Sequence, residues 1–131
     1  MDDAETLKRP DLPQGNDPRP LPADTLVADY RIEAVLGAGG FGITYLVTDV
    51  ALNKPFALKE YYPRGYAHRA GHLVVPNADG TEIYAWGLNR FQEEARAIAK
   101  FQHAAIIAVS RVFEANGTAY MVLAYEPGQT M

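Results

Sequence analysis

LGAGGFGITYLV, residues 36–47, holds four glycines within six positions and leads directly into residues typical of a β-strand. Glycine costs conformational entropy, so such a cluster indicates that the backbone itself is needed there. Gly37, Gly39 and Gly42 match GxGxxG, which dinucleotide-binding folds use where a strand enters a helix. Here the β-branched and aromatic run 43–48 predicts a second strand. The stretch therefore predicts a strand–turn–strand unit whose backbone N–H groups can hold phosphate oxygens, with a ligand-free hairpin as the alternative.

Composition is that of one folded domain without disulfides. The chain has 131 residues, of which 48% are hydrophobic, enough to build a core. It has no cysteine, and its three histidines, His68, His72 and His103, are scattered, so we expect no metal site in this stretch. The start, MDDAETLKRP, lacks the apolar region of a signal peptide, and no apolar run is long enough to span a membrane. We therefore expect a cytoplasmic domain, with a membrane span after residue 131 left open.

Charge and proline content divide the chain at residue 27. Residues 1–27 are rich in proline and polar side chains, which predicts a disordered leader. Residues 28–131 are expected to fold. The net charge of −4 lies entirely in residues 1–29, which carry seven acidic and three basic side chains. Because the remaining charges balance, the sequence argues against a nucleic-acid partner.

Periodicity along the chain predicts an α+β domain with the element order β-β-β-insertion-α-β-β. The insertion spans 62–85, where we expect irregular chain with a hairpin of 72–75 and 81–84. After it, apolar residues at helical spacing predict a helix over 86–102, and 114–117 predicts a turn between the last two strands. The predicted strands span 30–36, 43–48, 56–61, 106–113 and 118–125.

Two charged side chains give the glycine-rich stretch a chemical context. In FALKEYY, residues 56–62, alternation places Ala57 and Lys59 on one face of the strand, which leaves room for a flat ring beside a cation. Glu94 falls on the apolar face of the predicted helix, where an acid is costly unless it is paired, and Lys59 is available. The alternatives are a solvated Lys59 and a Glu94 that reaches water from the edge of that face.

These segments together resemble the N-terminal lobe of eukaryotic-like protein kinases, in particular the bacterial serine/threonine kinases. GAGGFGIT, FALK, FQEEARAIAKFQH and YMVLAYEPG occur in the family's order, and the resemblance covers residues 28–131 to just past the hinge. It implies an α+β fold with a five-stranded antiparallel sheet and one main helix, helix C. The insertion would lie between the third strand and helix C.

The resemblance also implies an ATP site. Lys59 would contact the α- and β-phosphates and pair with Glu94 of helix C, for which Glu82 and Glu93 are the competing candidates. Leu123 would be the gatekeeper, the residue that precedes the hinge. The residues implied to surround the nucleotide are Leu36, Gly37, Gly39, Phe41, Gly42, Thr44, Ala57, Lys59, Leu123, Ala124 and Glu126.

The family's remaining catalytic motifs are absent from this sequence. No HRD, DFG or APE segment occurs in the 131 residues, so the resemblance implies that the catalytic Asp and the Mg²⁺ ligands lie in a C-terminal lobe. We expect this stretch to bind ATP, yet to be unable alone to transfer the γ-phosphoryl group to protein Ser/Thr hydroxyls. Apolar surface left uncovered would favour that lobe or self-association. The alternatives are a pseudokinase or regulatory nucleotide-binding module, and a non-enzymatic interaction module.

Overall fold

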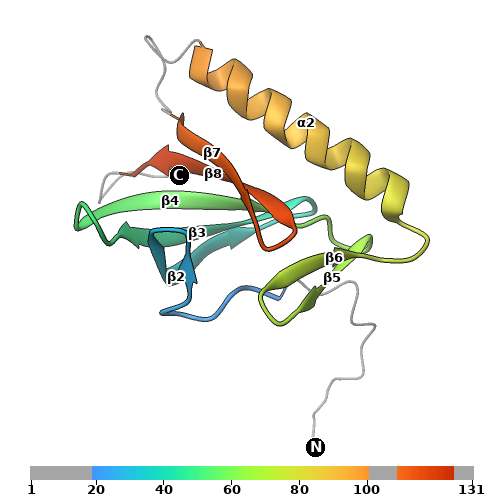
Figure 1. Ribbon diagram of the computed structural model, residues 1–131, viewed down its shortest axis with the longest axis horizontal. Coiled ribbons are helices and arrows are strands. Elements are labelled where there is room, and N and C mark those ends of the chain that lie inside the picture. Colours follow the sequence, from blue (N-terminus) through green and yellow to red (C-terminus); the bar gives the residue numbers. More distant parts are fainter. Residues whose placement is uncertain (1–18, 101–108, 126–131) are drawn as a thin grey trace, which may run out of the picture.

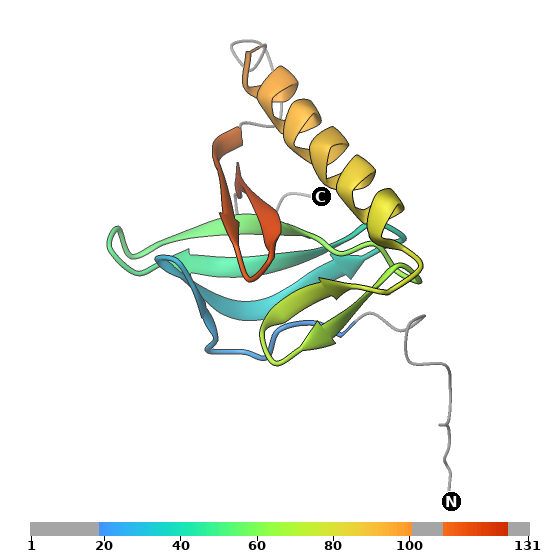
Figure 2. The same ribbon diagram turned by 45° about the vertical axis from the view of Figure 1, so that its right-hand side comes forward.

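The computed structural model describes residues 19–100 and 109–125, with side chains in the first range up to residue 97. Within these ranges a six-stranded antiparallel sheet, in the order β1-β2-β3-β4-β8-β7, packs under one helix, α2 (Figure 1). A separate hairpin of β5 and β6 lies beside the sheet, near the start of α2 (Figure 2). The elements are β1 Leu26–Val27, β2 Tyr30–Ala38, β3 Gly42–Asp49, β4 Lys54–Tyr61, β5 Ala67–Ala70, β6 Leu73–Pro76, α2 Thr81–Lys100, β7 Val109–Ala115 and β8 Thr118–Ala124.

The predicted fold class is confirmed, because a mostly antiparallel sheet carries a single helix within the described residues. The five predicted strands correspond to β2, β3, β4, β7 and β8, although residues 106–108 of the fourth lie outside the described residues. A sixth strand, β1, pairs Leu26 with Arg31 and Val27 with Tyr30 at the edge of the sheet. The glycine-rich stretch connects β2 to β3, as a strand–turn–strand unit requires.

The helix begins five residues earlier than the sequence pattern indicates, at Thr81. Residues 81–84 are therefore the first turn of α2, and their assignment to a hairpin strand is wrong. The hairpin forms instead from Ala67–Ala70 and Leu73–Pro76. Residues 81–84 are helical because their apolar residue continues the stripe on the core-facing side of α2, and this helical spacing outweighs the short strand-like alternation. That stripe consists of Tyr84, Leu88, Phe91 and Ala95.

The predicted leader is too long, because residues 19–27 are part of the folded domain. Leu21 and Val27 are each only 2% exposed and belong to the hydrophobic core. The N–H of Leu21 also donates a hydrogen bond of 3.0 Å to the Tyr45 hydroxyl. Two apolar side chains and one buried hydrogen bond thus order a segment that composition alone assigns to disorder. Residues 1–18 lie outside the described residues.

The turn between β7 and β8 connects the insertion and α2 to the sheet. Asn116 and Gly117 have φ values of 54° and 74°, as the predicted tight hairpin turn requires. The Asn116 carbonyl accepts a 2.8 Å hydrogen bond from the Val74 N–H of β6. The Gly117 carbonyl accepts a 2.6 Å hydrogen bond from the Tyr84 hydroxyl of α2. One two-residue turn therefore positions both the β5–β6 hairpin and the first turn of α2.

A buried ion pair between Glu60 and Arg69 connects β4 to the insertion. Glu60 is completely buried, and its Oε1 and Oε2 accept hydrogen bonds of 2.7 and 2.9 Å from the two terminal nitrogens of Arg69. The hydroxyls of Tyr45 and Tyr120 donate to the same carboxylate at 2.8 and 2.6 Å. Arg69 Nε donates to the Arg19 carbonyl, in the segment predicted as leader, at 2.8 Å. The pair is therefore bidentate and joins that segment, β3, β4, β5 and β8 at one point.

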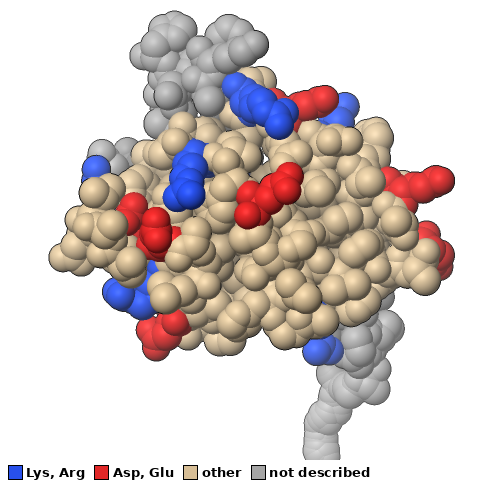
Figure 3. Space-filling view, viewed as in Figure 1, with Lys and Arg blue, Asp and Glu red and all other residues tan. Residues whose placement is uncertain are grey.

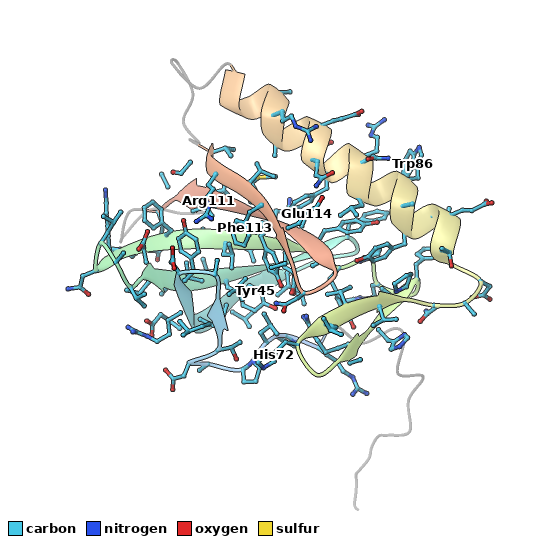
Figure 4. The ribbon with its side chains drawn as sticks, in the orientation of Figure 1. Tyr45, His72, Trp86, Arg111, Phe113 and Glu114 are labelled. Carbon is cyan, nitrogen blue, oxygen red and sulfur yellow. The ribbon has the colours of Figure 1, made fainter. Side chains whose placement is uncertain are left out.

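The surroundings of this pair fix the protonation of its partners. Burial, and then the charge of Glu60, raises the pKa of both Tyr45 and Tyr120 above the ordinary value, so both hydroxyls stay protonated and donate. Burial alone would lower the pKa of Arg69, but the hydrogen bonds and charge of Glu60 outweigh it and raise that pKa. Tyr45 lies in the interior, and His72 lies in the β5–β6 turn, where its carbonyl accepts from Arg69 (Figure 4).

Replacing Arg69 with methionine should destabilise the chain strongly. The substitution leaves the Glu60 carboxylate buried without its cation, which typically costs about 3–5 kcal/mol of unfolding free energy. Urea unfolding at neutral pH measures the loss. Arg31→Met is the matched control, because its ion pair with Glu33 is partly exposed and should matter little. Equal urea midpoints for the two variants would contradict this account of the buried pair.

Candidate functional site

A cavity of about 570 Å³ lies between the glycine-rich loop, β4 and the middle of α2. Its volume falls in the usual range of small-molecule sites. The loop forms one wall, β3 and β4 form the floor, and α2 forms the opposite wall. The lining residues are Gly37, Ala38, Gly39, Phe41, Gly42, Thr44, Lys59, Tyr61, Trp86, Gly87, Arg90, Phe91 and Glu94.

Strand register places the cationic side chain of Lys59 on the floor of the cavity. Gly37 pairs with Thr44, and Thr44 pairs with Lys59, so the three lie in one row across β2, β3 and β4. Because side chains alternate along β4, Lys59 faces the cavity while its neighbour Glu60 faces the buried network. Strand β4 thus supplies Lys59 to the cavity and, on its opposite face, Glu60 to the buried hydrogen-bond network.

The glycines of the loop are needed for different reasons. A Cβ added at Gly42 would lie 2.8 Å from the Glu60 carbonyl oxygen, so packing against β4 excludes a side chain there. At Gly37 and Gly39 an added Cβ would meet no atom within 4 Å. Packing within the described protein does not require glycine at those two positions. Their lack of side chains instead leaves the backbone open to close approach by a ligand.

The tip of the loop is fixed through its carbonyl groups, while two of its N–H groups have no acceptor among the described residues. The carbonyls of Gly40 and Phe41 accept hydrogen bonds of 2.8 and 3.0 Å from the N–H groups of Arg64 and Tyr62. The Gly39 N–H donates to the Gly42 carbonyl at 2.9 Å. Within the described part of the chain, the N–H groups of Gly40 and Phe41 have no acceptor. Successive backbone N–H groups of this kind form a site suited to an anion.

Helix α2 contacts the floor of the cavity through Tyr61. The Tyr61 hydroxyl donates a 3.0 Å hydrogen bond to the Tyr84 carbonyl, and its ring lies 5.8 Å from that of Phe91. A Cβ added at Gly87 would collide with the Tyr61 ring and hydroxyl. Burial, and secondarily Tyr84, raises the pKa of Tyr61 to about 12, so the hydroxyl remains a donor. A glycine inside a helix costs about 1 kcal/mol, so Gly87 in the predicted helix 86–102 could have indicated this close approach, although the sequence analysis did not single it out.

Lys59 and Glu94 line the same cavity but do not pair. Both side chains are exposed, and neither takes part in an ion pair among the described residues. The structure therefore does not contain the predicted pair, which stays a prediction, and Glu94 is exposed on its helix. The physical reason is solvation, because an exposed carboxylate has no desolvation cost that would force pairing. Of the three candidate acids, Glu94 lines the cavity, whereas Glu82 and Glu93 do not.

The chain is similar to known protein kinases, although no protein-family model matches it. The probable serine/threonine-protein kinase YbdM of Bacillus subtilis is 29% identical over 102 residues, which are 78% of this chain and 34% of that protein. The serine/threonine-protein kinase PrkC of the same organism is 26% identical over 102 residues, or 78% of this chain and 13% of PrkC. The chain is homologous to bacterial serine/threonine protein kinases.

Solved structures give the same relationship. The apo form of PpkA-294 is 35% identical with a TM-score of 0.78, over 85% of this chain and 40% of that one. The Mycobacterium tuberculosis PknI kinase domain, at 24% identity and a TM-score of 0.55 over 81% of this chain and 36% of that one, shows the fold alone. The chain therefore spans well under half the length of these kinases and matches their N-terminal lobe. In the nomenclature of protein kinases, α2 corresponds to helix C, and residues 62–80 are an insertion before it.

The residues expected around the adenine lie beside the cavity of this kinase lobe, not in it. Ala57 is completely buried and pairs with Leu123 in the register of β4 and β8. Leu36 and Ala124 are exposed, and neither lines the cavity. Glu126 lies outside the described residues. The structure thus brings together the loop, Thr44, Lys59 and Glu94, with Ala57 and Leu123 adjacent on the same sheet face.

Three further observations concern membrane-spanning segments, metal sites and the distribution of surface charge. Within residues 19–100 and 109–125, no helix is long and apolar enough to cross a membrane. In the same ranges no three His, Cys, Asp or Glu residues gather where a metal ion could bind. On the face shown in Figure 3, basic and acidic side chains are scattered and form no continuous patch of one sign.

Gly87→Ala should destabilise the chain, although alanine is the better helix former. The new methyl group would push α2 off Tyr61, and such overpacking typically costs about 1–3 kcal/mol. Urea unfolding measures the change. Asn89→Ala is the matched control, because Asn89 is exposed on the same helix and should keep or raise stability. A Gly87→Ala variant more stable than the wild type would show that Tyr61 does not set the helix position.

Proposed function

We propose that this chain is the ATP-binding lobe of a serine/threonine protein kinase, with ATP in the cavity between the loop, β4 and α2. One observation carries the proposal: the glycine-rich loop and an ammonium group without an ion-pair partner among the described residues line one concave site. Phe41 of the loop, whose N–H has no acceptor among the described residues, and Lys59 both line this site. A triphosphate is held by such backbone donors together with a lysine. Homology to YbdM and PpkA-294 supports the same assignment.

Within this proposal the loop covers the phosphates and the sheet holds the base. Lys59 contacts the α- and β-phosphates, and Phe41, which is 61% exposed at the loop tip, shields them from water. The open space above Gly37 and Gly39 fits phosphate oxygens that approach the backbone. The remaining nucleotide contacts are assigned to Leu36, Gly42, Thr44, Ala57, Leu123, Ala124 and Glu126.

Glu94 is proposed as the partner of Lys59 in the active arrangement. Kinases require this lysine–glutamate pair for phosphoryl transfer. In the structure α2 contacts β4 at Gly87, through Tyr61, and Glu94 lies about two helical turns further along. A pivot of α2 about Gly87 would therefore carry Glu94 towards Lys59. Docking of a C-terminal lobe or binding of ATP are the events that we expect to favour that movement.

Phosphoryl transfer is assigned to residues outside this stretch. Mg²⁺ in kinases is held by the Asp of DFG and an Asn of the catalytic loop, and the 131 residues contain no HRD or DFG segment, so we assign its ligands to a C-terminal lobe. When bound, Mg²⁺ neutralises charge on the phosphates. Lys59 and the loop N–H groups would bind and orient the nucleotide. We propose a cytoplasmic location for this lobe, because ATP is available there.

The 131-residue chain should bind ATP, and Lys59→Met should weaken that binding at least about tenfold, the usual cost of a lost charged hydrogen bond. Trp86 is the only tryptophan and lines the cavity, so its fluorescence reports the titration. Lys54→Met is the matched control, because Lys54 lies on the same strand outside the cavity. Equal affinity of Lys59→Met and the wild type, or no saturable response to ATP, would refute the site.

The longer protein that contains this lobe should phosphorylate serine or threonine, whereas the 131-residue chain should not. Radiolabelled ATP, a general protein substrate and analysis of phosphoamino acids measure the transfer. Lys59→Met in the longer protein should abolish it, because the α- and β-phosphates lose their cation. ATP binding without transfer by the longer protein would indicate a pseudokinase and overturn the proposed activity. Transfer by the 131-residue chain would show that no second lobe is needed.

A further inference from the structure

The α2 wall of the cavity carries a cation to which the proposed function assigns no role. Arg90 lines the cavity from α2, opposite the floor that holds Lys59. The charged side chains of the lining are Lys59, Arg90 and Glu94, so two cations face one acid. None of the three forms an ion pair among the described residues. The cavity therefore carries a net positive charge, which suits a polyanion better than a neutral ligand.

The Arg90 side chain contacts an aromatic ring and, among the described residues, forms no ion pair with a carboxylate. The Arg90 guanidinium lies over the Trp86 ring, 5.4 Å from its centre, one turn earlier on the same helix. Trp86 projects from the N-terminal half of α2 and is 60% exposed (Figure 4). Glu94 lies four residues after Arg90, where ion pairs can form within a helix, yet it does not pair with it. A cation stacked on an aromatic ring keeps its N–H donors available for a ligand.

We propose that Arg90 binds the terminal phosphates of the nucleotide from the helix wall, opposite Lys59. The inference rests on the proposed ATP site. Arg90 lines the cavity together with the glycine-rich loop and Lys59, whereas Ala57 and Leu123, assigned to the adenine, lie outside the lining, further along the sheet face. The end of the site that Arg90 faces is therefore the phosphate end. A guanidinium binds phosphate through two parallel hydrogen bonds, which suits it to a group that carries several oxygens.

Binding of phosphate by Arg90 would also affect the position of α2. Lys59 is fixed on β4, whereas Arg90 belongs to the helix that must move if Glu94 is to approach Lys59. A phosphate held between Lys59 and Arg90 draws the helix wall towards the floor. The number of phosphates on the nucleotide would then decide how strongly α2 is held. Arg90 would thus link nucleotide identity to the helix position.

The test compares ATP with AMP. Arg90→Gln should weaken ATP binding about tenfold and change AMP binding less than about twofold, because AMP lacks the distal phosphates. Calorimetry with the 131-residue chain measures both, since removal of Arg90 also alters the environment of Trp86. Arg96→Gln is the matched control, because Arg96 is exposed on the same helix outside the cavity. Arg90→Lys should recover part of the ATP affinity, since it keeps the charge but not the bidentate geometry.

The measurements distinguish a failure of the proposed role of Arg90 from a failure of the proposed ATP site. Unchanged ATP affinity in Arg90→Gln, or equal losses for ATP and AMP, would overturn the role of Arg90 while leaving the ATP site in place. The proposed function itself fails if the wild type binds no ATP or if Lys59→Met binds it normally. A selective loss for ATP in Arg90→Gln, with Arg96→Gln unaffected, supports the proposal.

Discussion

The buried ion pair between Glu60 and Arg69 is the interaction on which the rest of the structure depends. It satisfies a fully buried carboxylate with a bidentate guanidinium and two tyrosine hydroxyls. A pair of this kind stabilises only when its geometry and hydrogen bonds are complete, as they are in this lobe. By joining residues 19–21, β3, β5 and β8 to β4, it fixes the strand whose adjacent residue, Lys59, faces the cavity. Alternation along one strand thus separates the face that supports the lobe from the face that carries the candidate chemistry.

The opposite wall of the cavity is positioned by a second set of contacts. Tyr61 supports α2 through a hydrogen bond to the Tyr84 carbonyl and through the space left by Gly87. The β7–β8 turn holds the first turn of the same helix through Gly117. The insertion before α2 is therefore structural, since it covers the supporting face and brings the helix to the sheet. Its length also separates Lys59 from Glu94 in the sequence, although both line one cavity.

The sequence predicted what depends on neighbouring residues and missed what depends on distant ones. The strand character of residues 43–48 predicted the strand–turn–strand unit, and alternation placed Lys59 on the open face. Glu60 and Arg69 were not recognised as a pair, because periodicity gives the face of a side chain and not its partner. The order of residues 19–27 was missed for the same reason, since the buried Leu21 is held by Tyr45, which is distant in the sequence. Pairing of Lys59 with Glu94 was inferred from the helix face of Glu94 and from the family resemblance, and it depends on a helix position that sequence does not fix.

We propose that β4 divides the lobe into a supporting face and a nucleotide face. An ATP titration followed by ¹⁵N–¹H correlation spectra of the 131-residue chain tests it most directly. We expect the amide signals of residues 39–42, Lys59 and residues 87–91 to shift together, while those of the β5–β6 hairpin stay in place. Shifts that gather on the hairpin and around Arg69, with the loop unchanged, would show that the nucleotide does not bind the face of β4 that carries Lys59.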